Sequence, residues 1–414
     1  MNIINDSIVS KLLPFVDAQN EGTSSIRLLG WTLDENLFKS GDIYTSQLCR
    51  LWLTYEHQGA RSSRSFFVKI PINSPAFEIF KTMGSYDEEI IVYTKILPAI
   101  YQFEKEHFTP RLYYSDEQNK TLVLEDLSQS GFKCIARRDQ LDFEHCYHAL
   151  RSLAKLHGLS AVVGNKNPEI LHWMKYQPEK SGDPEFHKSV MDRIPMYIDS
   201  LSEDIKQKYP DQVLALRNLS WSDVVEDYLR TGPHNFCVFG HGDFWTNNIM
   251  FKYNDTSNAI VQNVRLIDFQ FGHWGNPAVD IIHFAITSMR FEVYQEYFNE
   301  LLRVYVDTLN EILVKYDCPT YSMELLLRDI AERYRYACLV FTCILPVNLA
   351  VSDERGNVEK GDSSEQQAPD DAWTKALKRS YKEQLYIDVS TKWLLHFIDR
   401  GFLHTVQKEP EGEK

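Results

Sequence analysis

The sequence lacks an apolar segment long enough to cross a bilayer. Its longest apolar run, Ala337–Val351, is interrupted by Pro346 and Asn348, whereas a membrane-spanning helix needs about 20 consecutive apolar residues. The N-terminal stretch MNIINDSIVSKLLPFVDAQN lacks the apolar core of a signal peptide. We therefore expect a cytoplasmic protein that has no membrane as a partner.

Paired cysteines and a basic surplus are also lacking. The seven cysteines are scattered and form no Cys-X-X-Cys pair, so neither a zinc site nor a disulfide framework is expected. With 44 Lys and Arg against 58 Asp and Glu, the net charge is −14, which argues against nucleic acid or an anionic membrane as a partner. No obligate protein partner is inferred, and 414 residues suffice for two lobes with separate cores.

A hairpin is predicted in the middle of the chain. Ile249–Tyr253 alternates like a strand, Asn254–Asn258 is rich in turn formers, and Ala259–Ile267 is extended again. Facing Cα atoms of antiparallel strands lie about 4.5–5.5 Å apart. The hairpin should therefore bring the amide of Asn248, which precedes it, next to the carboxylate of Asp268, which follows it.

A further carboxylate lies just upstream of this hairpin. Asp243 belongs to a tight His241-Gly242-Asp243 turn, and Asn248 follows it five positions later. Each residue alone would be an ordinary turn former or cap. Two carboxylates and an amide that converge, however, suit Mg2+, which binds oxygen ligands and keeps phosphate oxygens. The same Asp-to-Asn spacing, with a metal-binding Asp downstream, occurs in kinases, so a phosphoryl-transfer centre is predicted.

A candidate phosphate loop lies near the N-terminus. Ser40-Gly41-Asp42 is a small-residue turn, and the segment after it alternates through Thr54 like a strand. Such a turn can lay backbone N–H groups against phosphates, although any hairpin turn has a similar composition. The hydroxyls of Thr45 and Ser46 are candidate phosphate contacts.

Lys69 and Glu89 are predicted to be partners at the nucleotide site. A lysine in a strand is usually a solvated edge charge, but Lys69 has apolar neighbours in Ser65–Ile70. It lies between the phosphate-loop candidate and a helix at Tyr86–Leu97 that carries Glu89. Kinases hold the lysine that contacts the α- and β-phosphates, and its glutamate partner, in this order.

The motifs HGDFWTNNIMF and LIDFQ resemble those of the ecdysteroid kinase-like (choline-kinase-like) family, a branch of the aminoglycoside phosphotransferase and choline kinase superfamily. The resemblance covers nearly the whole chain and implies an α+β, protein-kinase-like, two-lobed fold. Residues 1–127 would form a β-rich nucleotide-binding lobe that includes the hinge strand, and residues 128–404 a mainly helical catalytic and acceptor-binding lobe. Residues 354–371 are expected to be a mobile loop and 405–414 a disordered tail.

The resemblance further implies a small-molecule kinase that uses ATP and Mg2+. Asp243 would accept or orient the proton of the acceptor hydroxyl, and Asn248 and Asp268 would hold Mg2+. Lys69 would add positive charge beside the phosphates. Gln270 replaces the Gly or acid of relatives and is assigned to the catalytic group, with its side chain near metal water or the acceptor.

Four more residues are assigned by position in the family pattern. Glu125 and Leu127 belong to the hinge, where the adenine would contact backbone groups. His241 should shape the catalytic loop by hydrogen bonding, and Asp280 should hold the backbone of that loop. An ordinary N-cap is the alternative for Asp280.

Helices are expected through most of the second lobe. Asp139 can cap a helix that runs to about His157, because the apolar residues between them have a helical period. Further helices are expected at roughly 291–316, 321–345 and 371–400.

The acceptor is predicted only as a class, a small lipophilic molecule with a hydroxyl, for which an ecdysteroid is the leading candidate. Trp245, Phe271 and Trp274 flank the catalytic segments and are candidates for its pocket, although aromatic residues are more often core. A choline- or ethanolamine-like acceptor would need an aromatic and acidic cage.

Two other classes of function stay open. A pseudokinase that binds nucleotide or ligand without turnover would keep the fold but would usually lack Lys69, Asp243 or Asp268, all of which are present here. A structural or interaction protein would explain none of the catalytic spacing.

Overall fold

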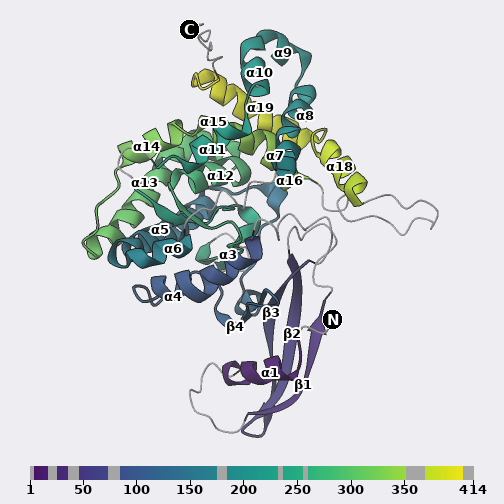
Figure 1. The fold of residues 1–414 in the computed structure, drawn as a ribbon, viewed down its shortest axis with the longest axis vertical. Helices are drawn as coiled ribbons and strands as arrows, with labels where there is room; N and C mark the ends of the chain where they lie inside the picture. Colours follow the sequence, from purple (N-terminus) through teal and green to yellow (C-terminus); the bar gives the residue numbers. More distant parts are fainter. Residues whose placement is uncertain are drawn as a thin grey trace, which may run out of the picture.

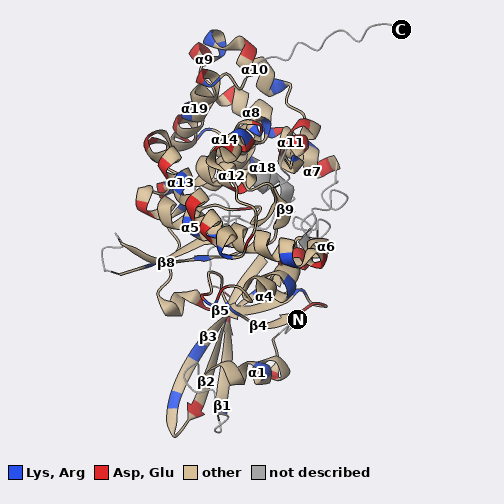
Figure 2. Ribbon diagram, turned by 90° about the vertical axis from the view of Figure 1, so that its left-hand side faces the viewer, with Lys and Arg blue, Asp and Glu red and all other residues tan. Residues whose placement is uncertain are grey.

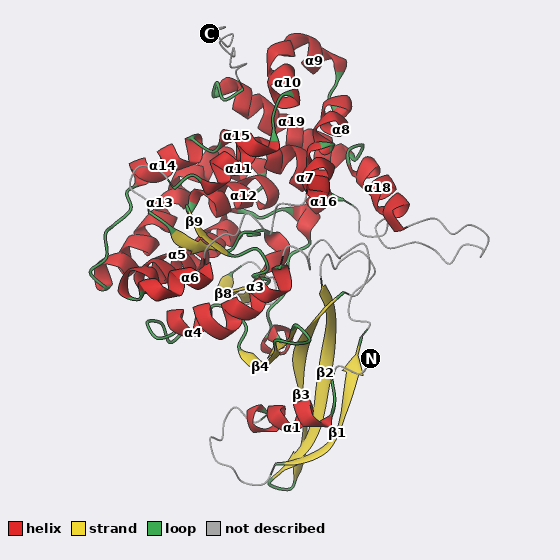
Figure 3. Ribbon diagram, in the orientation of Figure 1, coloured by secondary structure: helices red, strands yellow, loops and turns green. Residues whose placement is uncertain are grey.

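The computed structural model describes residues 4–16, 26–35, 46–72, 84–174, 184–231, 236–254, 260–350 and 369–403. The chain forms a β-rich lobe and a larger, mainly helical lobe (Figures 1 and 3), which confirms the predicted α+β two-lobed architecture. Thr45, the Ser40–Asp42 turn and the tail 405–414 lie outside the described residues. So does most of the segment 354–371, of which 369–371 begin a helix.

The smaller lobe is built on a five-stranded antiparallel sheet with the order β1-β2-β3-β5-β4. Its strands are β1 (Arg27–Asp34), β2 (Ser46–His57), β3 (Ala60–Pro71), β4 (Leu112–Asp116) and β5 (Thr121–Glu125). Helix α1 (Asp6–Leu12) buries its apolar residues together with those of β2 and β3, in a core separate from that of the larger lobe. Lys69 of β3 lies opposite Leu48 of β2 and Leu122 of β5.

A helical segment lies between this sheet and the larger lobe (Figure 1). It consists of α3 (Ser85–Ile91), a π-helical turn (Val92–Ile96) and α4 (Leu97–Ile100). The helix predicted at Tyr86–Leu97 is therefore present, and it ends close to the expected residue. Glu89 is buried on α3.

Helices make up most of the larger lobe (Figure 3). They are α5 (Phe143–Lys166), α6 (Leu171–Met174), α7 (Pro184–Met191), α8 (Arg193–Ser200), α9 (Glu203–Lys208), α10 (Pro210–Arg217), α11 (Trp221–Leu229), α12 (Ala278–Ser288), α13 (Phe291–Lys315), α14 (Met323–Ala331), α15 (Tyr334–Leu339), α16 (Leu345–Leu349), α18 (Pro369–Ser380) and α19 (Gln384–Asp399).

Three sequence-based helix predictions need correction, one of which is the single helix expected at 371–400, because α18 and α19 divide it. Asp142, rather than Asp139, caps α5, because its carboxylate accepts the backbone N–H of His145 at 3.1 Å. Asp139 ends a 3-10 turn before that helix. The single helix expected at 321–345 is divided into α14, α15 and a π-helical turn, Val340–Ile344, that leads into α16.

Short strands position the predicted catalytic segments of the larger lobe. β6 (Val238–Gly240) pairs with β9 (His273–Gly275), and β7 (Ile249–Tyr253) pairs with β8 (Val261–Leu266). The second pair confirms the predicted hairpin. It is extended by a hydrogen bond of 3.0 Å from the N–H of Ile267 to the carbonyl of Asn248, which places Asn248 beside the residue before Asp268.

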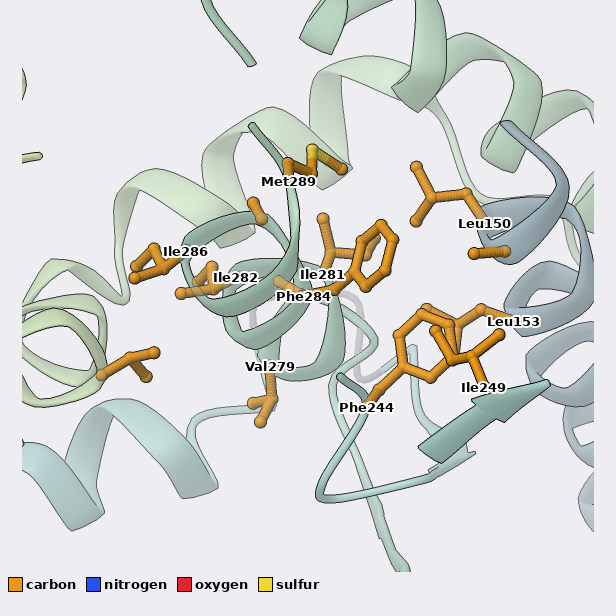
Figure 4. Close-up of a cluster of buried hydrophobic side chains, with 14 of the residues drawn as sticks. Leu150, Leu153, Phe244, Ile249, Val279, Ile281, Ile282, Phe284, Ile286 and Met289 are labelled. Carbon is orange, nitrogen blue, oxygen red and sulfur yellow. The ribbon is translucent and has the colours of Figure 1, made fainter. Parts of the chain in front are cut away.

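Helix α12 lies at the centre of the larger lobe. All its residues are buried, which is typical of a helix inside a core. Figure 4 shows its apolar side chains beside Leu150 and Leu153 of α5 and beside Phe244 and Ile249. The rings of Phe284 and Phe244 are 4.9 Å apart, so the segment between β6 and β7 is packed directly against this helix.

The outer helices carry acidic and basic positions interspersed along their length (Figure 2). Within the described ranges, no helix is both long and apolar enough to span a membrane.

Candidate active site

Lys69 lies between two carboxylates that come from distant segments of the chain. Its Nζ is 2.7 Å from Glu89 Oε2 of α3 and 2.8 Å from Asp268 Oδ1, which follows β8. Burial by itself lowers the pKa of Lys69, but the two carboxylates outweigh it and raise this pKa above its usual value. The structure thus brings the predicted partners together around an ammonium group that stays charged.

Asp268 has an uncommon backbone conformation. Its φ is +67°, a left-handed value that few residues other than glycine adopt, although Asp tolerates it better than most. Its side chain remains 32% exposed while one oxygen contacts Lys69. Backbone strain of this kind is often kept at functional sites.

Asn248 holds Asp243 in the loop between β6 and β7, which we call the catalytic loop (residues 241–248). Its Nδ2 donates to the backbone carbonyl of Asp243 at 2.8 Å and to Oδ2 at 2.9 Å. Trp245 Nε1 donates to the same Oδ2 at 3.2 Å. The other oxygen, Oδ1, lies 3.4 Å from His283 Nε2.

The contacts of Asp243 keep its carboxylate ionised. Burial by itself raises its pKa, but the neighbouring His283 and His241 and the amide of Asn248 together lower this pKa below its usual value. A buried, ionised carboxylate beside the cavity is chemically suited to accept a proton.

The oxygens of Asn248 and Asp268 fit a magnesium ion. Because the amide nitrogen of Asn248 faces Asp243, its carbonyl oxygen is directed away from that residue. Asp268 Oδ1 contacts Lys69, and Oδ2 has no hydrogen-bond partner among the described residues. Those residues contain no cluster of three or more His, Cys, Asp or Glu that forms a metal site. Two protein oxygens are, however, typical of Mg2+ sites that also use phosphate oxygens and water.

Asp280 of α12 holds the backbone of the catalytic loop. Its Oδ2 accepts the N–H of His241 at 2.6 Å, and its Oδ1 accepts the N–H of Gly242 at 2.9 Å. His157 Nε2 lies 3.0 Å from Oδ2. Burial alone raises the pKa of Asp280, but these donors leave it far below its usual value. Since α12 begins at Ala278, Asp280 is not the N-cap that was considered as an alternative.

His241 and Gly242 fix the loop against the segment that follows Asp268. The Nε2 of His241 donates to the carbonyl of Ile267 at 2.9 Å. Gly242 has φ of +80°, and a Cβ at this position would lie 1.9 Å from the carbonyl oxygen of Phe271. Glycine is therefore required here.

The hinge contains a buried carboxylate that the sequence analysis did not single out. Asp126 lies between Glu125 and Leu127 and accepts hydrogen bonds from Arg50 Nε at 2.7 Å and Ser65 Oγ at 2.6 Å. It thereby joins β2 and β3 to the start of the larger lobe. The sequence feature that could have identified Asp126 is its position just after the apolar strand β5.

Gln270 is directed toward the smaller lobe. Its Nε2 donates to Ser46 Oγ at 2.9 Å, and both side chains are almost fully buried. The contact joins the segment after Asp268 to the first residue of β2. The catalytic role assigned to Gln270 stays a prediction.

A cavity of about 790 Å³ connects these groups. The predicted residues on its wall are Ser46, Lys69, Glu89, Glu125, Leu127, Asp243, Trp245, Asn248, Asp268, Gln270 and Phe271. His241 and Asp280 support the catalytic loop from behind. Trp274 of β9 is not on this wall, because its ring packs against Gly164 of α5, so its position does not support the predicted contact with the acceptor.

His283 is the other residue that the sequence analysis did not single out. It lies one helical turn after Asp280 on α12, and this i, i+3 spacing on one helix face was the only sequence signal for it.

A model of the ecdysteroid kinase-like family matches residues 40–317, a range that contains every predicted site residue. No curated protein matches the chain. Among solved structures, the GDP complex of wild-type aminoglycoside 2′-phosphotransferase-IIIa is similar over 96% of this chain and 100% of that chain, with 10% identity and a TM-score of 0.35.

Proposed function

This chain belongs to the ecdysteroid kinase-like family, and on that premise we propose that it is a kinase that transfers the γ-phosphate of ATP to a hydroxyl of a small lipophilic molecule. The observation that carries the proposal is the Lys69 ammonium between Glu89 and Asp268, in the same cavity as the hydrogen-bonded pair Asp243 and Asn248. Phosphoryl transfer asks a protein mainly to position groups and neutralise charge.

Asp243 is the proposed base. Asn248 and Trp245 both donate to its Oδ2, so Oδ1 is the oxygen available to the acceptor hydroxyl. Oδ1 would accept the hydroxyl proton as the acceptor oxygen bonds to the γ-phosphorus, while the bond from that phosphorus to the bridging oxygen breaks and ADP leaves.

Lys69 is the proposed contact for the nucleotide phosphates. Glu89 keeps the ammonium in place from the buried side. Asn248 and Asp268 would hold Mg2+, which when bound neutralises charge on the phosphate oxygens.

The hinge end of the cavity is the proposed adenine site. Its wall there combines the backbone of Glu125–Leu127 with apolar side chains of both lobes, among them Leu48, Leu124, Met250 and Ile267. Apolar side chains beside hinge backbone groups suit a purine base.

A neutral, lipophilic acceptor fits the rest of the cavity better than a cationic one. Trp245 of the catalytic loop and Phe271, which follows Asp268, lie on the cavity wall, and Val347 of α16 adds a further apolar surface. A quaternary ammonium would need an uncommitted carboxylate as well as aromatic rings. Of the lining carboxylates, Glu89, Asp126 and Asp268 already have cationic partners, and Asp243 is the proposed base. The remaining one, Glu125, lies at the hinge end that is assigned to the adenine.

The acceptor that we favour is an ecdysteroid or a related steroid or xenobiotic alcohol.

The seven cysteines are all unpaired thiols, which fits the reducing cytoplasm as the compartment of the reaction.

The test is ATP consumption by the purified chain with Mg2+ against ecdysteroids, choline, ethanolamine and plant glycosides, with mass spectrometry to detect an added phosphate. A phosphorylated ecdysteroid that is absent with Asp268→Ala supports the full proposal. A phosphorylated choline would refute the lipophilic acceptor, and ATP binding without any phosphorylated product would favour a binding protein without turnover. We expect Asp243→Asn to bind ATP but to lose most turnover, and equal turnover would contradict the assigned base.

A further inference from the structure

Helix α12 contacts the catalytic loop at successive turns. Asp280 accepts the backbone N–H groups of His241 and Gly242, and Ser288 Oγ accepts the N–H of Thr246 at 3.0 Å. Both contacts hold backbone atoms. His283 lies between these two residues on the helix, and it faces a side chain, the carboxylate of Asp243.

The imidazole of His283 is buried, and one of its nitrogens makes no ordinary hydrogen bond within the part of the chain that the structure describes. Its Nδ1 lies 3.2 Å from the hydroxyl of Tyr336 on α15. Among the described residues its Nε2 makes no hydrogen bond of ordinary geometry, although the residue is only 3% exposed. Nε2 lies 3.4 Å from Asp243 Oδ1. A buried polar atom without a partner is costly, so its retention needs an explanation.

The two neighbours of the ring favour one tautomer. A carboxylate oxygen only accepts hydrogen bonds, so an Nε2 without a proton would direct its lone pair at the negative Oδ1 of Asp243. The hydroxyl of Tyr336 can donate to Nδ1, which leaves the ring proton on Nε2. With this tautomer, Nε2–H is directed at the oxygen that the two other donors leave open.

We propose, on the basis of the function proposed above, that His283 is a positioning residue for Asp243. Its Nε2–H holds the Oδ1 side of the carboxylate, as Asn248 and Trp245 hold the Oδ2 side. Asp243 is then fixed in rotation with Oδ1 presented to the acceptor hydroxyl. The separation of 3.4 Å exceeds that of an ordinary hydrogen bond, and catalytic contacts of this kind often shorten when substrate binds.

The kinetic test compares two substitutions at this position. His283→Leu fills the space without a donor, whereas His283→Gln places an amide N–H near the position of Nε2. We expect His283→Leu to lower kcat about 10- to 100-fold, the equivalent of one hydrogen bond to a charged group, with KM for ATP unchanged. His283→Gln should recover most of the lost kcat. Wild-type kcat in His283→Leu, or equal losses in the two variants, would overturn the proposal.

A measurement that needs no acceptor tests the same geometry. In the 15N-histidine NMR spectrum of the full chain, the signals absent from His283→Gln identify His283, and we expect its Nε2 to be protonated and its Nδ1 not. Tyr336→Phe should disturb this preference, because it removes the donor to Nδ1. An unprotonated Nε2 in the wild-type chain would overturn the proposal. If the wild-type chain phosphorylates no acceptor, the proposed function fails. The protonation of Nε2 in the NMR spectrum would still show whether His283 holds Asp243.

Discussion

Replacing Gly242 by alanine should impair catalysis far more than stability. With φ of +80°, an alanine at this position has a left-handed backbone, which costs about 1–2 kcal/mol. Its Cβ would also lie 1.9 Å from the carbonyl oxygen of Phe271 and 2.5 Å from the carbonyl carbon, whereas non-bonded atoms prefer about 3.5 Å. The loop or the facing segment must therefore shift by more than about 1 Å, a misplacement that can cost about 100-fold in rate.

Gly59 offers a matched control for this substitution. Its φ is +79°, but a Cβ there meets nothing within 4 Å. Gly59→Ala should therefore show the backbone penalty alone, seen as a lower melting temperature with unchanged kcat. Gly242→Ala should show a kcat reduced about 100-fold or more, with ATP binding largely kept. If the two variants have kcat values within about threefold of each other, the steric reasoning is refuted.

Three further predictions concern the groups around the cavity. Asp280→Asn should lower the free energy of unfolding by about 3–5 kcal/mol at neutral pH. Folding lowers the pKa of Asp280, so the difference in unfolding free energy between the wild type and Asp280→Asn should shrink as pH falls below about 4. A difference that does not change with pH in urea unfolding would contradict this prediction. Lys69→Met should abolish the ATP-induced rise in melting temperature, since it leaves Asp268 without its cation; an undiminished rise would contradict the proposed phosphate contact. Gln270→Ala and Ser46→Ala should each cost about 0.5–1.5 kcal/mol of stability, and a much larger loss of kcat in Gln270→Ala would support its catalytic assignment.

The contacts that were predicted correctly depend on local spacing and on the order of residues along the chain. The hairpin between Asn248 and Asp268 follows from alternation and turn composition, and antiparallel pairing then determines which residues face each other. The meeting of Lys69 with Glu89 was predictable only because their order along the chain resembles that in kinases.

The residues that were missed depend on contacts between segments far apart in sequence. His283 meets Asp243 and Tyr336 only because α12 is surrounded by the core of the larger lobe. Trp274 is an aromatic residue of the kind expected in an acceptor pocket. The pairing of β9 with β6, however, places its ring against Gly164 and away from the cavity wall. The cap of α5 was placed one turn too early because Asp139 and Asp142 are equally good N-cap residues, and only their backbone conformations distinguish them.

The separate cores of the two lobes determine which parts of the site open together. Strand β3, which carries Lys69, shares a core with β2 and α1, whereas the catalytic loop shares the core around α12. In native-state hydrogen exchange, amides of His241 and Gly242 should therefore open with those of α12, and amides of β2 and β3 should form a separate unit. Local opening of the smaller lobe would then release Lys69, the proposed nucleotide contact, while Asp243, the proposed base, keeps its geometry. Loss of ATP binding on warming should therefore precede loss of order around Asp243.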